Sequence, residues 1–295
     1  MGRFIVVGDL MTDVVTRVMG PITLGTDTPS KVESYGGGSG ANVAAWLGRQ
    51  GQDVVYIGRR GPDVVGRTRE MELLGYGIDS RVVMDQARAT GTCVVLVSPT
   101  GERSVFPDPG ANAALSPEDV PAQLFGGDVH VHVSGYPIFH EGGRDGALTA
   151  LRYAVDRGLS CSVDASSATM LERLGGDTFL SYVSGATLLL ANKEEARFLS
   201  GEHDPFSAAR ALTKYFPHVV VKDGAQGAVW CSVGENPVHV DPPRVKVVDL
   251  TGAGDAFCAG MLAKWRAGAA PDEALTAGCR LAALVLTQPG ARPAD

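Results

Sequence analysis

The stretch Val247-Val-Asp-Leu-Thr-Gly-Ala-Gly-Asp-Ala-Phe-Cys-Ala-Gly260 is the most informative part of this chain. Its apolar pair Val247 and Val248 predicts a short strand that ends at Asp249, and small residues turn the backbone at 252–254. A helix-patterned run with apolar residues at positions 257, 261 and 265 comes next. The pattern predicts a short strand, a glycine turn and then a helix that begins at the turn.

Such a helix start is a natural anion site. Its first N–H groups lack intrahelical partners and the positive end of the dipole points outward, which favours phosphate oxygens. Asp255 lies in the first turn. A carboxylate there repels a bound phosphate unless it accepts a proton from a hydroxyl that attacks the phosphoryl group. For Asp255 taken alone, a helix cap is an equally good explanation.

Composition limits the class of protein. The chain has 295 residues, 44% of them hydrophobic, enough for one large α/β domain or two smaller ones. A net charge of -7 without a basic cluster argues against a nucleic-acid partner. Five scattered cysteines without a Cys-x-x-Cys pair predict reduced thiols, and the apolar run Phe4–Val7 is too short for a signal or membrane helix. We therefore expect a cytoplasmic enzyme that does not contact membranes.

Short β-branched runs alternate with helix-like stretches along the chain. The predicted strands are Phe4–Val7, Val54–Ile57, Val129–Val133, Leu159–Val163, Thr187–Leu190 and Val219–Val221. The predicted helices are Ala41–Arg49, Val64–Leu74, Gly146–Arg157 and Glu194–Leu199. This alternation predicts a parallel sheet with helices on both faces.

Two stretches interrupt the alternation. Val14–Val18 with Lys31–Tyr35, and Thr90–Ser98 with Arg103–Phe106, are typical of extended segments joined by turns. We interpret them as a small separate sheet, a discontinuous lid at about residues 12–35 and 89–107 of a single domain covering 1–295. Because both faces of residues 93–97 are apolar, one face can close over a substrate and the other, with Val95 taken as outward-facing, can pair with a second subunit.

Two polar features near the amino terminus suit a hydroxyl-rich ligand. The glycines of Gly36–Asn42 let a ligand approach the backbone, and Asn42 offers both a donor and an acceptor. Asp13 follows the first strand, at the sheet edge where open α/β sheets bind ligands. The alternatives are a plain loop and a solvated turn residue. A dinucleotide site fits poorly, because the preceding Lys31–Tyr35 is half polar rather than a buried strand.

Three further patterns have structural alternatives of their own. Asn192 and Glu195 form a helix capping box that also places an amide and a carboxylate where they can order magnesium-bound water. Lys222-Asp-Gly-Ala-Gln-Gly227 is an ordinary hairpin signal. His130 and His132 share one strand face, but a metal site there lacks a third ligand.

Together these motifs resemble the PfkB, or ribokinase-like, family of small-molecule kinases, from Phe4 to about Gly290. Asp249–Asp255 is similar to the family pattern Asp-Thr-x-Gly-Ala-Gly-Asp at every place except Leu250, where Thr is usual. Further matches are Gly37–Asn42, Val55–Gly58 leading to Gly61–Asp63 and Gly66, Gly75–Asp79, and Gly110–Asn112. The resemblance implies a three-layer α/β/α sandwich with a mostly parallel central sheet and a small β-sheet lid.

The resemblance also implies roles for single residues. Asp255 becomes the catalytic base, and the anion hole is formed by Gly252, Ala253 and Gly254. Substrate hydroxyls are bound by Asp13, Gly37, Gly38 and Asn42, whereas the nucleotide side comprises Asn192, Lys222, Gly224, Gly227 and Thr251. Glu195 holds magnesium through water. The resemblance leaves open a monovalent cation such as K⁺ beside Asp249 and Thr251.

Two departures from the family pattern bear on specificity. Ser39 stands where ribokinases proper usually carry Lys, and Ala277-Gly-Cys279 differs from the Asn that many members place in the adenine pocket. With ATP as the default nucleotide, we expect transfer of the γ-phosphoryl group to a hydroxyl, preferably primary, of a sugar or sugar derivative. A nucleoside kinase is the main alternative, with an aromatic wall from Tyr35, Phe106 and Tyr136. A non-catalytic sugar-binding relative fits less well, because a pure binder needs no base.

Overall fold

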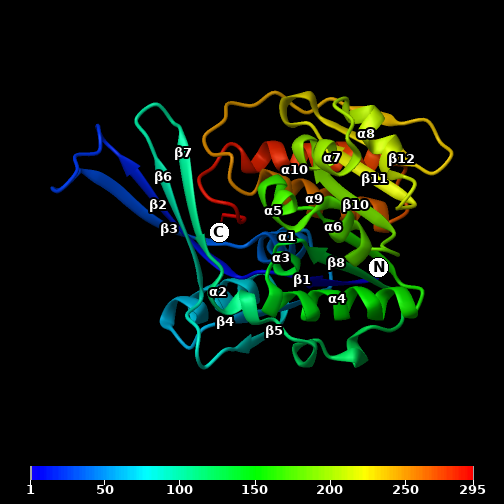
Figure 1. The fold of residues 1–295 in the computed structure, drawn as a ribbon, viewed down its shortest axis with the longest axis horizontal. Helices are drawn as coiled ribbons and strands as arrows, with labels where there is room; N and C mark the ends of the chain where they lie inside the picture. The colour runs from blue at the N-terminus through cyan, green and yellow to red at the C-terminus, as the bar shows by residue number, and fades with distance from the viewer. Residues whose placement is uncertain (1, 295) are drawn as a thin grey trace.

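The computed structural model describes residues 2–294 and has three layers, a central sheet covered by helices on both faces (Figure 1). The central sheet has nine strands in the order β13-β12-β11-β10-β9-β8-β1-β4-β5. Pairing is parallel from β11 to β5, and β12 and β13 are antiparallel. In chain order these strands are β1 (Arg3–Val7), β4 (Val54–Arg60), β5 (Asp79–Met84), β8 (Val129–Ser134), β9 (Ser160–Asp164), β10 (Leu188–Asn192), β11 (His218–Lys222), β12 (Ala228–Ser232) and β13 (Val238–Val240).

Two apolar cores hold the layers together. One core packs β1 and its neighbours against α3 (Tyr136–Phe139), α4 (Glu141–Asp156), α5 (Ala168–Leu174), α6 (Gly176–Tyr182), α7 (Lys193–Ser200) and α8 (Pro205–Leu212). The other packs the opposite face against α1 (Ser39–Arg49), α2 (Val64–Gly75), α9 (Ala253–Arg266) and α10 (Pro271–Val285). Strands covered on both faces read as continuous apolar runs, which is why β1 is buried from Phe4 to Val7. Each fully buried aliphatic side chain contributes about 1.5–3 kcal/mol.

Short 3-10 turns complete the connections. They are η1 (Gly110–Ala114), η2 (Pro117–Asp119), η3 (Ala122–Leu124) and η4 (Gly224–Gln226).

Within residues 2–294, no helix combines the length and apolar character needed to cross a membrane.

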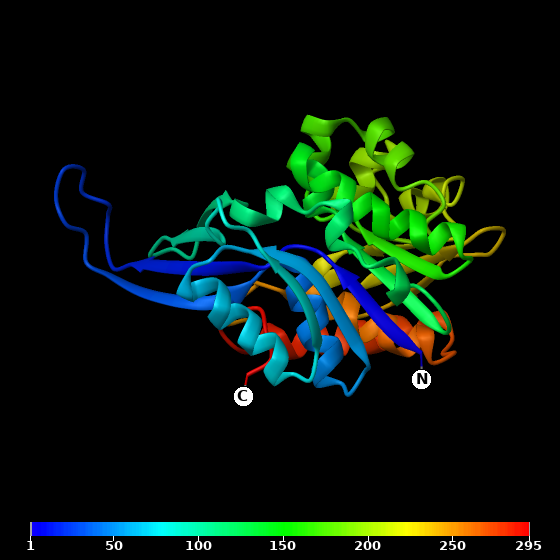
Figure 2. The ribbon, with the colours of Figure 1, turned by 90° about the horizontal axis from the view of Figure 1, so that it is seen from below.

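A second, four-stranded sheet, called here the lid sheet, has the order β3-β2-β6-β7. Its strands are β2 (Met11–Val18), β3 (Ser30–Gly37), β6 (Gly91–Val97) and β7 (Arg103–Asp108). The β2–β3 and β6–β7 pairs are antiparallel, and β2 and β6 are parallel. The hairpin of β2 and β3 projects furthest from the body (Figure 2).

Side-chain alternation gives the lid sheet two different faces. Val95 is 3% exposed and packs with Val15, Cys93 and Val97 on the inner face. The prediction that Val95 faces outward is therefore wrong, because the odd-numbered residues of β6 point the same way as Asp13 and Val15 of β2. Val94 and Phe106, 40% and 59% exposed, are neighbours across β6 and β7 on the outer face.

Two local predictions are also corrected. Val247 and Val248 form no strand. Residues 241–250, which include the prolines 242 and 243, have no regular structure, and both valine side chains are exposed. Val248 N–H instead donates to the Leu286 carbonyl. Asp13 lies within β2 of the lid sheet, not in the loop that directly follows β1.

Candidate active site

A cavity of ≈ 920 Å³ lies at the carboxyl ends of the parallel strands. Its lining comes from the loop after β1, the ends of β9, β10 and β11, the start of α9, and the inner face of the lid sheet through Met11, Asp13, Cys93, Val105 and Pro107. Open α/β sheets bind ligands at this edge. The lid sheet thus contributes a wall of the same cavity as the sheet edge.

Gly252 sets the direction of α9 at the centre of the cavity. It is the N-cap residue with φ of 76°, in the left-handed region. A Cβ at this position would lie 2.5 Å from the Ala291 Cβ, so the close approach also excludes larger residues. The turn directs the first N–H groups of α9 and the Asp255 side chain toward the cavity.

Asp255 accepts two hydrogen bonds from α1. Ser39 Oγ donates to its Oδ1 at 2.8 Å, and Asn42 Nδ2 donates to its Oδ2 at 2.8 Å. Burial raises the pKa of Asp255 to about 7, although these two hydrogen bonds lower it. A carboxylate with a pKa near neutrality can accept a proton at physiological pH.

Asp13 lies at the lid end of the cavity. Burial raises its pKa to about 6, against the lowering effect of the Arg292 charge. Its carboxylate lies against Gly37, where any Cβ would collide with it. Asp13 is therefore a partly desolvated acceptor beside the glycine turn that leads into α1.

Arg292 fixes the orientation of Asn42. Its Nε donates to Asn42 Oδ1 at 3.3 Å, Nη2 donates to the Gly37 carbonyl at 2.8 Å, and Nη1 pairs with Glu72 Oε2 at 2.7 Å. Because a guanidinium only donates, the amide oxygen of Asn42 must face Arg292 and its NH₂ group must face Asp255. Burial lowers the pKa of Arg292, with Glu72 acting in the opposite direction.

The opposite end of the cavity carries a buried ion pair. Lys222 Nζ lies 2.5 Å from Asp164 Oδ2, and Cys258 Sγ donates to the same oxygen at 3.2 Å. Burial lowers the pKa of Lys222, but Asp164, Cys258 and Glu195 more than offset it and the pKa stands well above its usual value. Lys222 is therefore a fixed cation at this end.

Asn192 and Glu195 form the capping box at the start of α7. Asn192 N and Nδ2 donate to the two Glu195 carboxylate oxygens at 2.8 and 2.7 Å, and Glu195 N donates back at 2.9 Å. Burial and then the Asp164 charge raise the pKa of Glu195 to about 7. The Asp164 charge thus disfavours ionisation of Glu195, and a cation bound beside Glu195 would favour it. No cluster of three or more potential metal ligands occurs among residues 2–294.

The structure brings most of the predicted site residues to one cavity. The residues that line it are Asp13, Gly38, Asn42, Asn192, Glu195, Lys222, Gly224, Thr251, Gly252, Gly254 and Asp255. Gly37, Ala253 and Gly227 lie outside the lining. Of the three aromatics considered for a nucleobase, only Tyr136 lines the cavity. Tyr35 packs against the core of the lid sheet, and Phe106 is exposed on its outer face.

Several residues of this site were not predicted. Asp164 ends β9, so the strand-end argument applied to Asp13 also points to it. In the sequence, Ser39 stands out only as a departure from the family pattern, yet in the structure its hydroxyl donates a hydrogen bond to the Asp255 carboxylate. Arg292 lies in the carboxyl-terminal segment and has no motif, so only the folded chain shows that it reaches Asn42. Sequence spacing carries no signal for such a contact.

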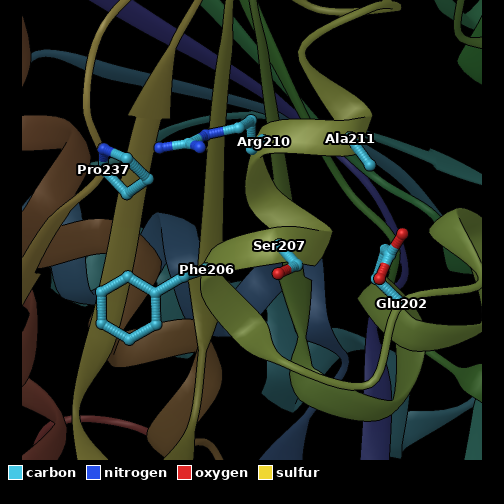
Figure 3. Close-up of a pocket in the computed structure, with 6 residues that line it drawn as sticks. All are labelled: Glu202, Phe206, Ser207, Arg210, Ala211 and Pro237. Atoms are coloured by element: carbon cyan, nitrogen blue, oxygen red, sulfur yellow. The ribbon is translucent and has the colours of Figure 1, made fainter.

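Two other features lie apart from this site. His130 and His132 of β8 both bond the Ser162 hydroxyl at 2.9 Å, which makes them a buried polar network rather than a metal site. A smaller cavity of ≈ 390 Å³ beside α8 is lined by Glu202, Phe206, Ser207, Arg210, Ala211 and Pro237 (Figure 3). None of its residues was predicted to bind a ligand.

Comparisons with known proteins identify the family of this chain. A family model described as pfkB family carbohydrate kinase matches residues 1–295. The fructokinase of Klebsiella pneumoniae is 31% identical over 280 residues, 92% of this chain and 87% of the relative. The ATP-dependent ribose-1-phosphate kinase of Halopiger xanaduensis is 30% identical over 296 residues, 100% of this chain and 95% of the relative.

One solved structure has a similar fold and carries ligands. The fructokinase from Vibrio cholerae O395, bound to fructose, ADP and a calcium ion, superposes with a TM-score of 0.84 at 25% identity. The alignment covers 99% of this chain and 94% of that chain.

Proposed function

This chain belongs to the pfkB family of carbohydrate kinases, and we propose that Asp255 is the base with which it transfers the γ-phosphoryl group of ATP to a sugar hydroxyl. The observation that carries the proposal is the place of Asp255. Its carboxylate lies in the first turn of α9, beside the turn at 252–254, and its pKa is about 7. A base at this position can orient an attacking hydroxyl and accept its proton while the helix start holds the phosphoryl group.

The acceptor binds at the end of the cavity next to the lid sheet. Asp13, Gly38 and Asn42 surround this end, and Gly37 supports the Asp13 carboxylate. Carboxylate and amide groups are suitable partners for sugar hydroxyls. The apolar lid residues Val105 and Pro107 line this end of the cavity, where they can limit the access of water that would otherwise accept the phosphoryl group.

The nucleotide binds at the opposite end. Lys222 neutralises phosphate charge, Gly224 keeps the hairpin turn close to the cavity, and Gly227 shapes that turn. Thr251 borders the anion hole formed by Gly252, Ala253 and Gly254. Magnesium, held through water by Glu195 beside Asn192, supplies charge neutralisation to the phosphates when bound.

The acceptor is a primary hydroxyl of a sugar or sugar derivative in this proposal. A nucleoside is the second candidate, supported by Tyr136 and by the apolar inner face of the lid sheet. Tyr35 and Phe106 give it no further support, since neither lines the cavity. The proposal also includes a homodimer formed through the outer face of the lid sheet, and a cytoplasmic location in keeping with ATP use and five free cysteines.

ADP release coupled to a reporter enzyme tests the acceptor directly. The panel contains pentoses, hexoses, keto-acid sugars and nucleosides, each with ATP and Mg²⁺. We expect acceptor-dependent ADP release with one or more sugars and little with nucleosides. A preference for nucleosides would favour the second candidate, and no acceptor-dependent release with any member would contradict the proposal.

A further inference from the structure

Two arginines of the lid sheet reach one buried carboxylate behind the anion turn. Arg103 of β7 places Nη1 3.4 Å from Asp249 Oδ1, and its Nη2 donates a hydrogen bond to Thr251 Oγ1. The Nη2 atom of Arg17 in β2 lies 3.9 Å from Asp249 Oδ2. Because Asp249 and Thr251 directly precede α9, these contacts join the lid sheet to the loop that forms the proposed anion hole.

Asp249 accepts hydrogen bonds at both carboxylate oxygens. Its Oδ1 accepts from Thr251 N at 3.0 Å and Thr251 Oγ1 at 2.7 Å, and its Oδ2 accepts from Gly290 N at 3.3 Å. The side chain is 5% exposed. Its ion-pair partners are Arg103 and Arg17, so the counter-charge of this carboxylate comes from the lid sheet.

This donor set does not fit a monovalent cation beside Asp249 and Thr251, the possibility that the family resemblance leaves open. A bound K⁺ needs oxygen atoms that converge with free lone pairs and no positive charge beside them. Here the Thr251 hydroxyl donates to Asp249 and accepts from Arg103, while N–H groups cover the carboxylate. The guanidinium already supplies one positive charge at this place.

We propose that Arg103 replaces the monovalent cation in this chain and ties the position of the lid sheet to the loop at 249–252. The inference rests on the proposed kinase function, because that loop leads into the proposed anion hole. Arg103 does not line the cavity, so it is a positioning residue rather than a catalytic one. Two consequences follow: phosphoryl transfer needs no K⁺, and loss of Arg103 disturbs the anion hole.

The test compares the wild type with Arg103→Met and Arg103→Lys in potassium, sodium or choline chloride at equal ionic strength. Thermal melting and initial rate are both measured. For the wild type we expect the same melting temperature in all three salts and rates within ~2-fold. Arg103→Met should lose ~10-fold or more in kcat in choline and regain part of it with K⁺ or methylguanidinium, which should also raise its melting temperature.

Two variants serve as controls. Arg103→Lys keeps the charge but replaces the fork that spans Asp249 and Thr251 by a single ammonium, so it should stay insensitive to K⁺ with a lowered kcat. Arg81→Met removes an exposed arginine that pairs with Asp79 on β5, and it should behave as the wild type.

Either of two results would overturn the inference. One is a wild-type protein whose melting temperature and rate both rise with K⁺ over choline. The other is an Arg103→Met variant with the wild-type rate and no response to any small cation. If no acceptor is phosphorylated in any salt, the proposed function fails, and the melting temperatures still decide whether a cation binds.

Discussion

Asp255, Glu195 and Asp13 are cavity carboxylates with pKa values raised toward neutral pH. Burial raises the pKa of Asp255 to about 7 and that of Asp13 to about 6. A base must be ionised to accept a proton, so kcat/KM should fall about tenfold for each pH unit below 7. A pH–rate profile checks this. If Asp255 is the source of the fall near pH 7, both Asp13→Asn and Glu195→Gln must retain it, since the pKa of Glu195 is also about 7.

The same pKa makes a prediction about stability. The folded state keeps the Asp255 proton to a higher pH than the unfolded chain, so the contribution of this residue to stability is lost as pH rises from about 4 to about 7. Asp255→Asn removes this penalty. We expect the variant to melt at a higher temperature than the wild type at pH 8 and at nearly the same temperature at pH 4. A lower melting temperature at pH 8 would show that Asp255 does not carry this penalty.

Asp13→Ala separates the two ends of the cavity. Removing a side chain that bonds a buried hydroxyl costs ~1–3 kcal/mol, so the KM for the acceptor should rise ~5–150-fold while the KM for ATP stays unchanged. Steady-state kinetics with each substrate varied in turn measures both constants. A variant with weakened ATP use and an unchanged acceptor KM would reverse the assignment of the two ends.

At the scale of single residues, a motif predicts where a residue lies along a helix or strand better than it predicts which distant residues contact it. The pattern at 249–255 correctly places Asp255 in the first turn of a helix that begins at Ala253. It gives no indication that Asn42 is oriented by Arg292, 250 residues away in sequence. Such contacts depend on tertiary packing, which a short pattern does not encode.

Among the elements, α9 offers a matched pair of glycines. Gly252 and Gly268 flank the helix with φ of 76° and 87°. A Cβ at 252 meets Ala291, whereas nothing lies within 4 Å of one at 268. Gly268→Ala should cost only the backbone strain, about 1–2 kcal/mol, because an L-residue is disfavoured in the left-handed region.

Gly252→Ala carries the same strain together with the collision. We expect it to lower the free energy of unfolding by more than Gly268→Ala does, and to lower kcat, which Gly268→Ala leaves intact. Denaturant titration and initial rates compare the two. Equal losses of stability with equal activity would show that the close approach to Ala291 does not constrain the turn.

In the central sheet, the buried strands could be predicted from the sequence, whereas the edge strands β5 and β13 could not. The strands β1, β4, β10 and β11 contain apolar runs because both of their faces are covered, and β8 and β9 combine buried apolar residues with buried His and Ser. The edge strand β5 contains Asp79 and Arg81 and lacks such a run, and β13 has only three residues. The predicted strand at Val247 and Val248 fails for the opposite reason, since two apolar residues after Pro242 and Pro243 gain no pairing partner.

At the scale of the whole molecule, the outer face of the lid sheet is the surface proposed to pair two subunits. Val94 and Phe106 lie side by side on this face and are largely exposed. Because an unpaired charge is costly in an apolar interface, Val94→Glu should raise the dimer dissociation constant ~10-fold or more. Met71→Glu, at an exposed apolar residue of α2, should leave it unchanged. Sedimentation measures the dimer dissociation constants of both variants, and a compact wild-type monomer at micromolar concentration would contradict the proposed dimer.

The central claim is that this chain moves a phosphoryl group from ATP to a sugar hydroxyl with Asp255 as the base. The most direct measurement is ³¹P NMR of ATP, Mg²⁺ and the best acceptor with the wild type and with Asp255→Asn at equal nucleotide saturation. The wild type should form one phosphate monoester for each ADP, and the variant should do so ~10²–10⁴-fold more slowly. Formation of ADP and inorganic phosphate without a monoester, or an Asp255→Asn rate within a few-fold of the wild type, would contradict the claim.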